Sequence, residues 1–149
     1  MSFSGSDVTF MNEALVLARK AYDENEVPVG AVVVMDGRII GQGYNLREKN
    51  RSAIAHAEMI AIEDACKNLG AWRLSDATLY VTLEPCPMCA GALAWSQIGR
   101  LVYGASDPKR GYSLFSPSLM HPKTEVVKGV EAEECGNLVS EFFKKKRNQ

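Results

Sequence analysis

The stretch Thr78-Leu79-Tyr80-Val81-Thr82-Leu83-Glu84-Pro85-Cys86-Pro87-Met88-Cys89 decides how this chain folds. Residues 78–83 are mostly β-branched, aromatic or aliphatic, which predicts a strand. The Cys86-Pro87 step predicts the start of a helix that runs to about Gln97, because proline is favoured at the first helical position. A strand that leads into a helix is the unit from which α/β sheets are built, and their binding sites lie at such junctions.

Strands and helices are predicted along the rest of the chain as well. We expect helices over 10–22, 55–69 and 131–146, and strands over 29–35, 38–44, 100–103 and 125–127. Asp36-Gly37 predicts a two-residue hairpin turn, whereas 105–122 is rich in Gly, Ser and Pro and gives no clear element. Because strands separated by helices need crossovers, the sequence predicts a three-layer α/β/α domain with a mixed five-stranded sheet and helices on both faces.

Length and composition predict one globular domain over residues 1–149. The chain has 149 residues, of which 46% are hydrophobic and 23% charged, as is ordinary for a soluble globular protein. These values exclude wholesale disorder and a membrane bundle. With 17 Lys and Arg against 18 Asp and Glu, the net charge is −1. This balance argues against a strongly basic nucleic-acid binder but leaves room for a local basic patch.

The N-terminal residues and the cysteines predict a cytoplasmic, reducing setting. The first residues lack a basic stretch followed by an apolar one, so we expect no signal peptide. The longest apolar run, 29–35, is too short to cross a bilayer, so we expect no membrane partner. In such a setting the close pair Cys86 and Cys89 is a metal or redox site rather than a disulfide.

Two predicted helix starts carry residues with metal-binding chemistry. His56 and Glu58 open one helix, and Cys86 and Cys89 open another. The three-residue spacing puts both sulfurs on one side of a first helical turn, where free N–H groups and the helix dipole stabilise thiolates. Two thiolates and one imidazole are three ligands for Zn²⁺. They leave the fourth tetrahedral position to water, as in catalytic zinc sites.

Glu58 supplies the second part of a hydrolytic site. Zinc lowers the pKa of its bound water to about 7 and so provides hydroxide at neutral pH. Glu58, two residues from His56, is placed to move the proton without binding the metal. This pairing suits attack on an amidine-like carbon followed by loss of ammonia.

Two other interpretations of the cysteine pair stay open at this point. A redox pair is possible, but it explains neither His56 nor Glu58. Half of a structural zinc site is also possible, but that site needs a further cysteine, and Cys66 faces the wrong way if it lies mid-helix. The presence of all these residues at two helix starts favours the catalytic zinc site.

The pattern His56-Ala57-Glu58 followed by Pro85-Cys86-Pro87-Met88-Cys89 resembles the signature of the cytidine deaminase superfamily. Within it, the chain is similar to the bacterial tRNA-specific adenosine deaminases over residues 10–147. The matching stretches are 26–31, 55–59, 72–74, 80–86 and 133–135. The resemblance implies the cytidine-deaminase-like fold, a Zn²⁺ cofactor and a homodimer. It also implies a tRNA anticodon stem-loop as partner, whose wobble adenosine is converted to inosine.

The resemblance also implies roles for individual residues. His56, Cys86 and Cys89 bind zinc, and Glu58 is the proton shuttle. The implied substrate contacts are a nucleoside hydrogen bond from Asn45, a base pocket lined by Pro28 and Val29, and a nucleotide-backbone contact from Asp107. Without the resemblance, Asn45 is a turn residue and Asp107 a helix cap or a loop residue.

Residues 111–124 depart from that family. The family usually has a longer, partly helical segment here that ends in Asn-His-Arg, where this chain has Met120-His121-Pro122. We expect this loop near the mouth of the active site, so the departure bears on tRNA recognition rather than on deamination. The alternative function is therefore a deaminase of a free nucleobase or nucleoside, such as guanine, cytosine or a related purine. Tyr112, Phe115 or His121 would then form a lid.

Three further features bear on partners. The run Phe-Phe-Lys-Lys-Lys-Arg at 142–147 places four positive charges beside two aromatic rings, which suits RNA but also a solvated helix end. Lys109-Arg110 adds charge near the pocket. The apolar segment 90–95 can pack against a copy of itself or against the core. A third function, a non-catalytic zinc-binding subunit, is disfavoured because such a subunit has no use for Glu58.

Overall fold

One mixed sheet forms the centre of the computed structural model, which describes residues 4–148. The strands of the sheet are β1 (Gly30–Met35), β2 (Arg38–Tyr44), β3 (Thr78–Leu83), β4 (Arg100–Ala105) and β5 (Glu125–Lys128). Within the described residues they lie in the order β2-β1-β3-β4-β5. β1 runs antiparallel to β2 and β3, whereas β3, β4 and β5 run parallel. The predicted mixed five-stranded sheet is confirmed.

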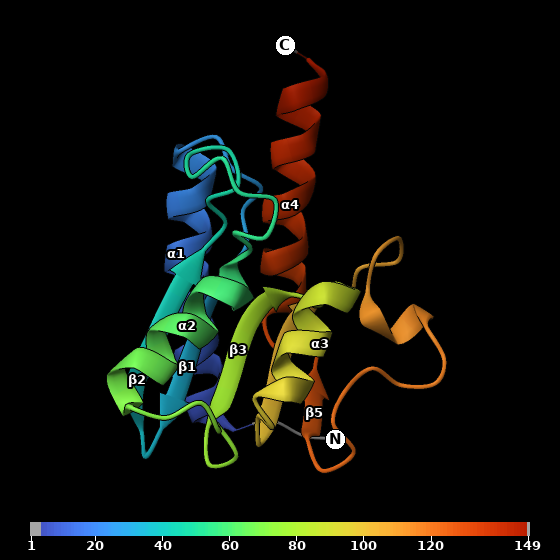
Figure 1. Ribbon diagram of the computed structural model, residues 1–149. Helices are drawn as coiled ribbons and strands as arrows, with labels where there is room; N and C mark the ends of the chain where they lie inside the picture. The colour runs from blue at the N-terminus through green and yellow to red at the C-terminus, as the bar shows by residue number, and fades with distance from the viewer. Residues whose placement is uncertain (1–3, 149) are drawn as a thin grey trace.

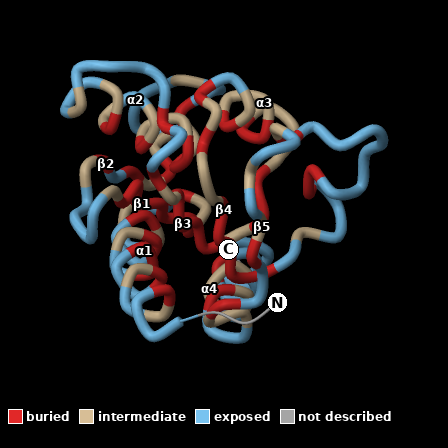
Figure 2. The backbone as a smooth tube through the Cα atoms, turned by 90° about the horizontal axis from the view of Figure 1, so that it is seen from below, coloured by how far each residue is buried: buried red, intermediate tan, exposed pale blue. Residues whose placement is uncertain are grey.

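Helices cover both faces of this sheet. They are α1 (Gly5–Asp23), α2 (Ala57–Leu69), α3 (Pro87–Trp95) and α4 (Ala132–Arg147), with a 3₁₀ turn η1 over Tyr112–Leu114. α1 and α4 lie on one face and α2 and α3 on the other, so the predicted three layers are confirmed (Figures 1 and 2). None of the helices within residues 4–148 is long and apolar enough to span a membrane.

Local signals explain the first helix and the first hairpin. The Ser4 hydroxyl accepts a hydrogen bond from the Asp7 N–H, and the Asp7 carboxylate accepts one from the Ser4 N–H. This capping box starts α1 at Gly5, ahead of the apolar periodicity that begins at Phe10. Asp36 and Gly37 have φ values of 52° and 74°, the left-handed pair that a type I′ turn requires, so the predicted hairpin turn is confirmed.

The central strands β1, β3 and β4 bury side chains on both faces, in keeping with their largely apolar sequences. Val32, Tyr80 and Val102 face the α1–α4 layer, and their neighbours Val33 and Leu79 face the α2–α3 layer. On the second face, glycine allows close contact between helix and sheet. A Cβ on Gly43 of β2 would lie 2.7 Å from the backbone oxygen of Ala57, so α2 starts directly against β2.

Candidate metal centre

The topology brings the predicted site residues to one edge of the sheet. β2 ends at Tyr44, β3 at Leu83 and β4 at Ala105, and the antiparallel β1 starts at this same edge with Gly30. α2 and α3 begin there too (Figure 1). The candidate metal ligands and the candidate substrate contacts all lie in the segments that join these ends.

The N-cap side chains of α2 and α3 contact each other instead of capping their own helices. His56 is the N-cap of α2 and Cys86 the N-cap of α3, and neither side chain makes a capping hydrogen bond. The Nδ1 atom of His56 lies 3.7 Å from Cys86 Sγ and 3.5 Å from Cys89 Sγ. The three ligand atoms lie within 4.8 Å of one another, so the residues can hold one metal ion.

The three side chains of this cluster interact strongly with one another. Two hydrogen bonds, one from Cys89 with the larger effect and one from His56, lower the pKa of the Cys86 thiol to about 4. The hydrogen bond to Cys86, together with burial, raises the pKa of Cys89. The hydrogen bond to Cys86 likewise raises the pKa of His56. A thiolate, a thiol and an imidazole that already share protons form a donor set suited to Zn²⁺, which displaces those protons on binding.

Glu58 lies in the first turn of α2 and is only 4% exposed. Burial raises its pKa to about 7, and the charge of Cys86 acts in the same direction. A carboxyl group with that pKa holds and releases a proton near neutral pH, which general acid–base work requires.

Asn45 joins the end of β2 to the start of α2. Its Oδ1 atom accepts a hydrogen bond of 2.7 Å from the Ala57 N–H, next to His56. Its own N–H donates to the Val29 carbonyl, which follows the buried Pro28. Asn45 thus has the structural role of a turn residue, and it holds Val29 beside the first turn of the metal-binding helix.

Asp107 has the structure of a loop cap. Its carboxylate accepts hydrogen bonds of 3.0 Å from the N–H groups of Lys109 and Arg110. The side chain therefore organises the loop after β4 and keeps the two exposed basic residues at its tip. This loop-cap role is the one that the sequence alone favours.

Two residues with evident roles at this edge were not predicted as site residues. Glu26 and Glu84 are 3% and 4% exposed, and their carboxylates accept backbone hydrogen bonds from the loops on either side of the cluster. The sequence signal for Glu84 was present. An acidic residue directly after an apolar strand and before Pro85 either is exposed or has dedicated partners.

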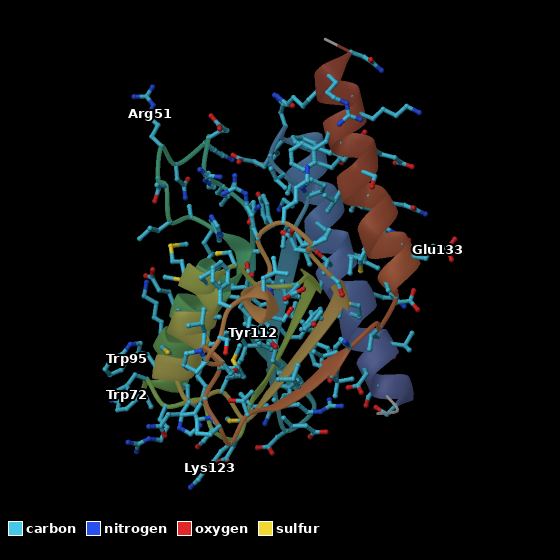
Figure 3. The ribbon with its side chains drawn as sticks, turned by 90° about the vertical axis from the view of Figure 1, so that its right-hand side faces the viewer. Arg51, Trp72, Trp95, Tyr112, Lys123 and Glu133 are labelled. Atoms are coloured by element: carbon cyan, nitrogen blue, oxygen red, sulfur yellow. The ribbon has the colours of Figure 1, made fainter. Side chains whose placement is uncertain are left out.

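The three residues that could form a lid in the alternative function, Tyr112, Phe115 and His121, lie in different surroundings. Tyr112 is buried against Tyr103 with ring centroids 6.4 Å apart, and its N–H donates to the Pro85 carbonyl. This part of the loop therefore lies beside the start of α3. His121 instead lines a hollow with Trp95, the last residue of α3. Figure 3 shows that Trp95 lies away from Tyr112. Phe115 is half exposed and stays available.

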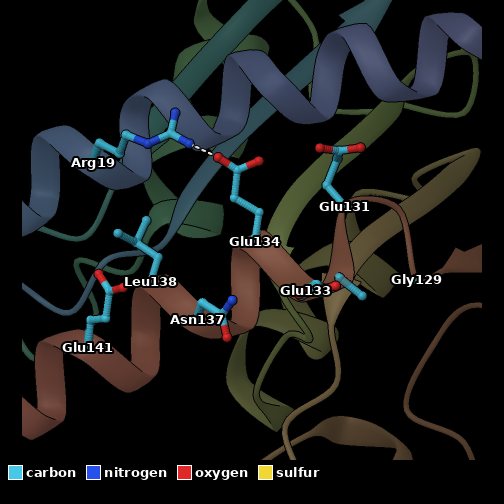
Figure 4. Close-up of a pocket in the computed structure, with 9 residues that line it drawn as sticks. Arg19, Gly129, Glu131, Glu133, Glu134, Asn137, Leu138 and Glu141 are labelled. Carbon is cyan, nitrogen blue, oxygen red and sulfur yellow. Dashed lines mark hydrogen bonds and ion pairs between the residues drawn. The ribbon is translucent and has the colours of Figure 1, made fainter.

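Two surface hollows in the described residues lie away from the metal cluster. One, of about 710 Å³, lies between α1 and the start of α4, on the opposite face of the sheet. Acidic side chains such as Glu131 and Glu141 line it, and Arg19 forms an ion pair with Glu134 across it (Figure 4). The other, of about 300 Å³, is lined by Trp72, Ala94, Trp95, Gln97 and His121.

Comparison with known proteins identifies the family. The sequence profile described as "Cytidine and deoxycytidylate deaminase zinc-binding region" matches residues 4–105. The chain is 51% identical to the tRNA-specific adenosine deaminase of Bacillus subtilis (strain 168) over 148 residues, covering 96% of this chain and 92% of that protein. It is 43% identical to the tRNA-specific adenosine deaminase of Streptococcus pyogenes serotype M18, covering 94% and 91%.

Solved structures agree with this relationship. A structure from a study of A-to-I editing by tRNA:A34 deaminases at the wobble position superposes with a TM-score of 0.82 and 43% identity, covering 87% of this chain and 98% of that one. A guanine deaminase of Bacillus subtilis also has 43% identity, but its TM-score is 0.63 and it covers 66% of this chain and 63% of that one. The chain belongs to the cytidine and deoxycytidylate deaminase family, among the tRNA-specific adenosine deaminases, and is a zinc-dependent enzyme.

Proposed function

We propose that this enzyme converts the wobble adenosine of a tRNA anticodon to inosine, with uptake of one water and release of ammonia. The observation that carries the proposal is the convergence of His56, Cys86 and Cys89 beside the buried Glu58. The similarity to tRNA-specific adenosine deaminases along nearly the whole chain supports adenosine in tRNA as the substrate.

In this proposal the cluster of one imidazole and two sulfurs holds the zinc. His56 supplies Nδ1, the ring nitrogen nearest to both sulfurs. A zinc ion held by these three residues would act as a Lewis acid and would make a water molecule nucleophilic enough to attack C6 of adenine. α2 and α3 both begin at this cluster, so the positive ends of their dipoles favour negative charge there.

Glu58 moves the protons. It takes a proton from the attacking water as the C6–O bond forms and passes it to N1 of the ring. It then moves the remaining hydroxyl proton to the exocyclic nitrogen as the C6–N bond breaks and ammonia leaves. A pKa of about 7 suits a group that must do both at neutral pH. Its burial keeps bulk water from exchanging that proton during the reaction.

Asn45, Pro28, Val29 and Asp107 make the proposed substrate contacts. The Asn45 side-chain amide donates a hydrogen bond from Nδ2 to the nucleoside, while its Oδ1 accepts one from the Ala57 N–H at the start of α2. Pro28 and Val29 are buried behind Asn45 and form the wall against which the base packs. Asp107 contacts the nucleotide backbone from the far side of the cluster, at the end of β4.

Basic residues at the same end of the molecule support an RNA substrate. The last turns of α4, which carry Lys144 and Arg147, project beyond the sheet at the end where α2 and α3 begin (Figure 1). Arg51 extends from the loop before α2 at that end (Figure 3). Of the two tail aromatics, Phe142 is buried on the apolar stripe of α4, whereas Phe143 is 44% exposed and can stack on a base.

We further propose a cytoplasmic homodimer in which residues 1–149 act as one domain. Trp72 and Trp95 are 57% and 83% exposed and border an apolar hollow at the end of α3. A pair of exposed tryptophans is typical of interface cores rather than of free surface. Sedimentation velocity tests this proposal: Trp95→Glu should yield a monomer if the wild-type protein is a dimer. A wild-type monomer would refute the dimer.

One assay separates the proposed substrate from the alternative. An anticodon stem-loop with wobble adenosine is incubated with the zinc-loaded enzyme beside guanine, cytosine, adenosine and cytidine, and both ammonia and inosine are measured. We expect inosine from the stem-loop and no ammonia from the free compounds, with Glu58→Ala as the inactive control. Turnover of guanine with an unchanged stem-loop would favour the function of the guanine deaminase relative.

A further inference from the structure

Two buried glutamates outside the metal cluster bond to the loops on either side of it. Glu26 precedes β1 and Glu84 follows β3, and both are almost fully buried. Among residues 4–148, neither forms an ion pair with Lys, Arg or His within 4.0 Å. A buried carboxylate is costly unless hydrogen bonds satisfy it, so the groups that it binds indicate its role.

Glu84 binds both ends of the segment 107–113, which follows β4. Its Oε1 accepts a hydrogen bond from the Asp107 N–H and its Oε2 accepts one from the Ser113 N–H, both of 3.0 Å. The loop closes directly over the carboxylate, because a Cβ added to Gly111 would lie 2.4 Å from Oε2. The proposed substrate contact Asp107 is therefore held through its own backbone.

Glu26 does the same for the loop between β2 and α2. Its Oε1 accepts from the Glu48 N–H at 3.2 Å and its Oε2 from the Lys49 N–H at 2.9 Å. This loop begins at Asn45, the other proposed polar contact to the substrate. Each loop beside the metal cluster is thus fixed by two charge-assisted hydrogen bonds to one buried carboxylate.

We propose that Glu26 and Glu84 are positioning residues that preform the two substrate-binding loops before the RNA arrives. The inference rests on the proposed function of those loops. A loop that is already ordered loses no further conformational entropy when the substrate binds. A residue that keeps the loop ordered therefore increases the affinity for the substrate. Neither Glu26 nor Glu84 is a proposed zinc ligand or the proton shuttle. We therefore expect their substitution to leave the chemical step unchanged.

Kinetics and hydrogen exchange on graded variants test this proposal. Glu84→Gln keeps one acceptor and Glu84→Ala keeps none, so KM for the stem-loop should rise in that order, reaching about tenfold, while kcat stays within about twofold. Amide exchange should accelerate in 106–114 but not in 45–52, and Glu26→Gln should reverse that pattern. Zinc content should match the wild type in each variant.

Two matched controls and one second variant keep the test decisive. Glu133→Gln alters an exposed glutamate on α4, and Gly136→Ala adds a methyl in ordinary contact with Ala105, so neither should change KM or loop exchange. Gly111→Ala displaces the Glu84 carboxylate from the loop side and should reproduce Glu84→Gln, even if Glu84→Ala does not fold.

The possible failures point to different claims. Unchanged loop exchange in Glu84→Gln and Gly111→Ala would overturn the anchoring role. Faster amide exchange in the loop with an unchanged KM would overturn the role of Glu84 in substrate binding. Equal losses of kcat and of bound zinc would overturn it too. A wild-type enzyme that leaves the stem-loop unchanged would reject the proposed function, whereas the exchange data would still decide whether the anchors exist.

Discussion

The two faces of the sheet bury carboxylates in opposite electrostatic settings. On the α1–α4 face, Asp7 is 1% exposed and accepts hydrogen bonds of 2.7 and 2.8 Å from Arg100 and one of 2.7 Å from the Tyr80 hydroxyl. On the α2–α3 face, Glu58 is buried almost as deeply. The hydrogen bond from Arg100 lowers the pKa of Asp7, whereas desolvation raises that of Glu58 to about 7. Equal burial thus yields a stabilising ion pair in one layer and a proton carrier in the other.

The largest expected effect comes from Glu58. Glu58→Gln preserves the volume of the side chain but cannot cycle a proton, so the rate of inosine formation should fall by about 10² to 10⁴. The free energy of unfolding should stay the same or rise, because a carboxyl group that is costly to bury is removed. Single-turnover kinetics measure the rate, and chemical denaturation measures the free energy of unfolding. Near-normal turnover would remove Glu58 from the mechanism.

Asp7 should show the opposite pattern. Asp7→Asn leaves Arg100 without its buried anionic partner, so the free energy of unfolding should fall by about 3 kcal/mol. The kcat of inosine formation should stay close to that of the wild type, because the pair lies on the other face of the sheet. A variant that keeps its stability but loses activity would break the contrast between the two faces.

Acid titration sharpens the same contrast. Arg100 holds the pKa of Asp7 in the folded protein below its ordinary value, so the unfolded chain binds this proton more readily. The contribution of the pair is fully present above about pH 4, the unfolded value, and is lost as the pH falls through the folded pKa. The difference in unfolding free energy between wild type and Asp7→Asn should therefore shrink between pH 7 and pH 3. A constant difference would contradict this linkage.

The smallest effect is expected at the basic end of α4, which belongs to neither buried cluster. Changing Lys144, Lys145 and Lys146 together to Ala should weaken stem-loop binding. The slope of log affinity against log salt should fall by about 1 for each lysine that binds a phosphate in the wild type. Lys123→Ala, at the opposite end of the molecule, is the matched control (Figure 3). An unchanged slope would favour a small substrate.

The sequence predicts what depends on local pattern and misses what depends on distant pairing. Proline spacing and hydrophobic runs predict the strand-to-helix junction at Cys86, and Asp36-Gly37 predicts the hairpin. The capping box that starts α1 also holds Asp7, whose pairing with Arg100 spans 93 positions and has no local signature.

The segment after β4 was the hardest to predict, for a related reason. Its order comes from one buried carboxylate, Glu84, and from Tyr112 and Met120, which fill gaps in the core of the α2–α3 layer. A stretch rich in Gly, Ser and Pro gives no periodicity from which such contacts can be inferred. The same limit explains why His121 was expected near the metal cluster rather than beside Trp95.

X-ray absorption at the zinc edge, on protein purified without added metal, tests the central claim most directly. We expect one zinc per chain with two sulfurs at about 2.3 Å and nitrogen or oxygen at about 2.0–2.1 Å in the remaining positions. Cys86→Ser should remove one sulfur from that shell or the metal altogether. Protein without zinc, or zinc in a shell that lacks sulfur, would contradict the assignment of His56, Cys86 and Cys89 as its ligands.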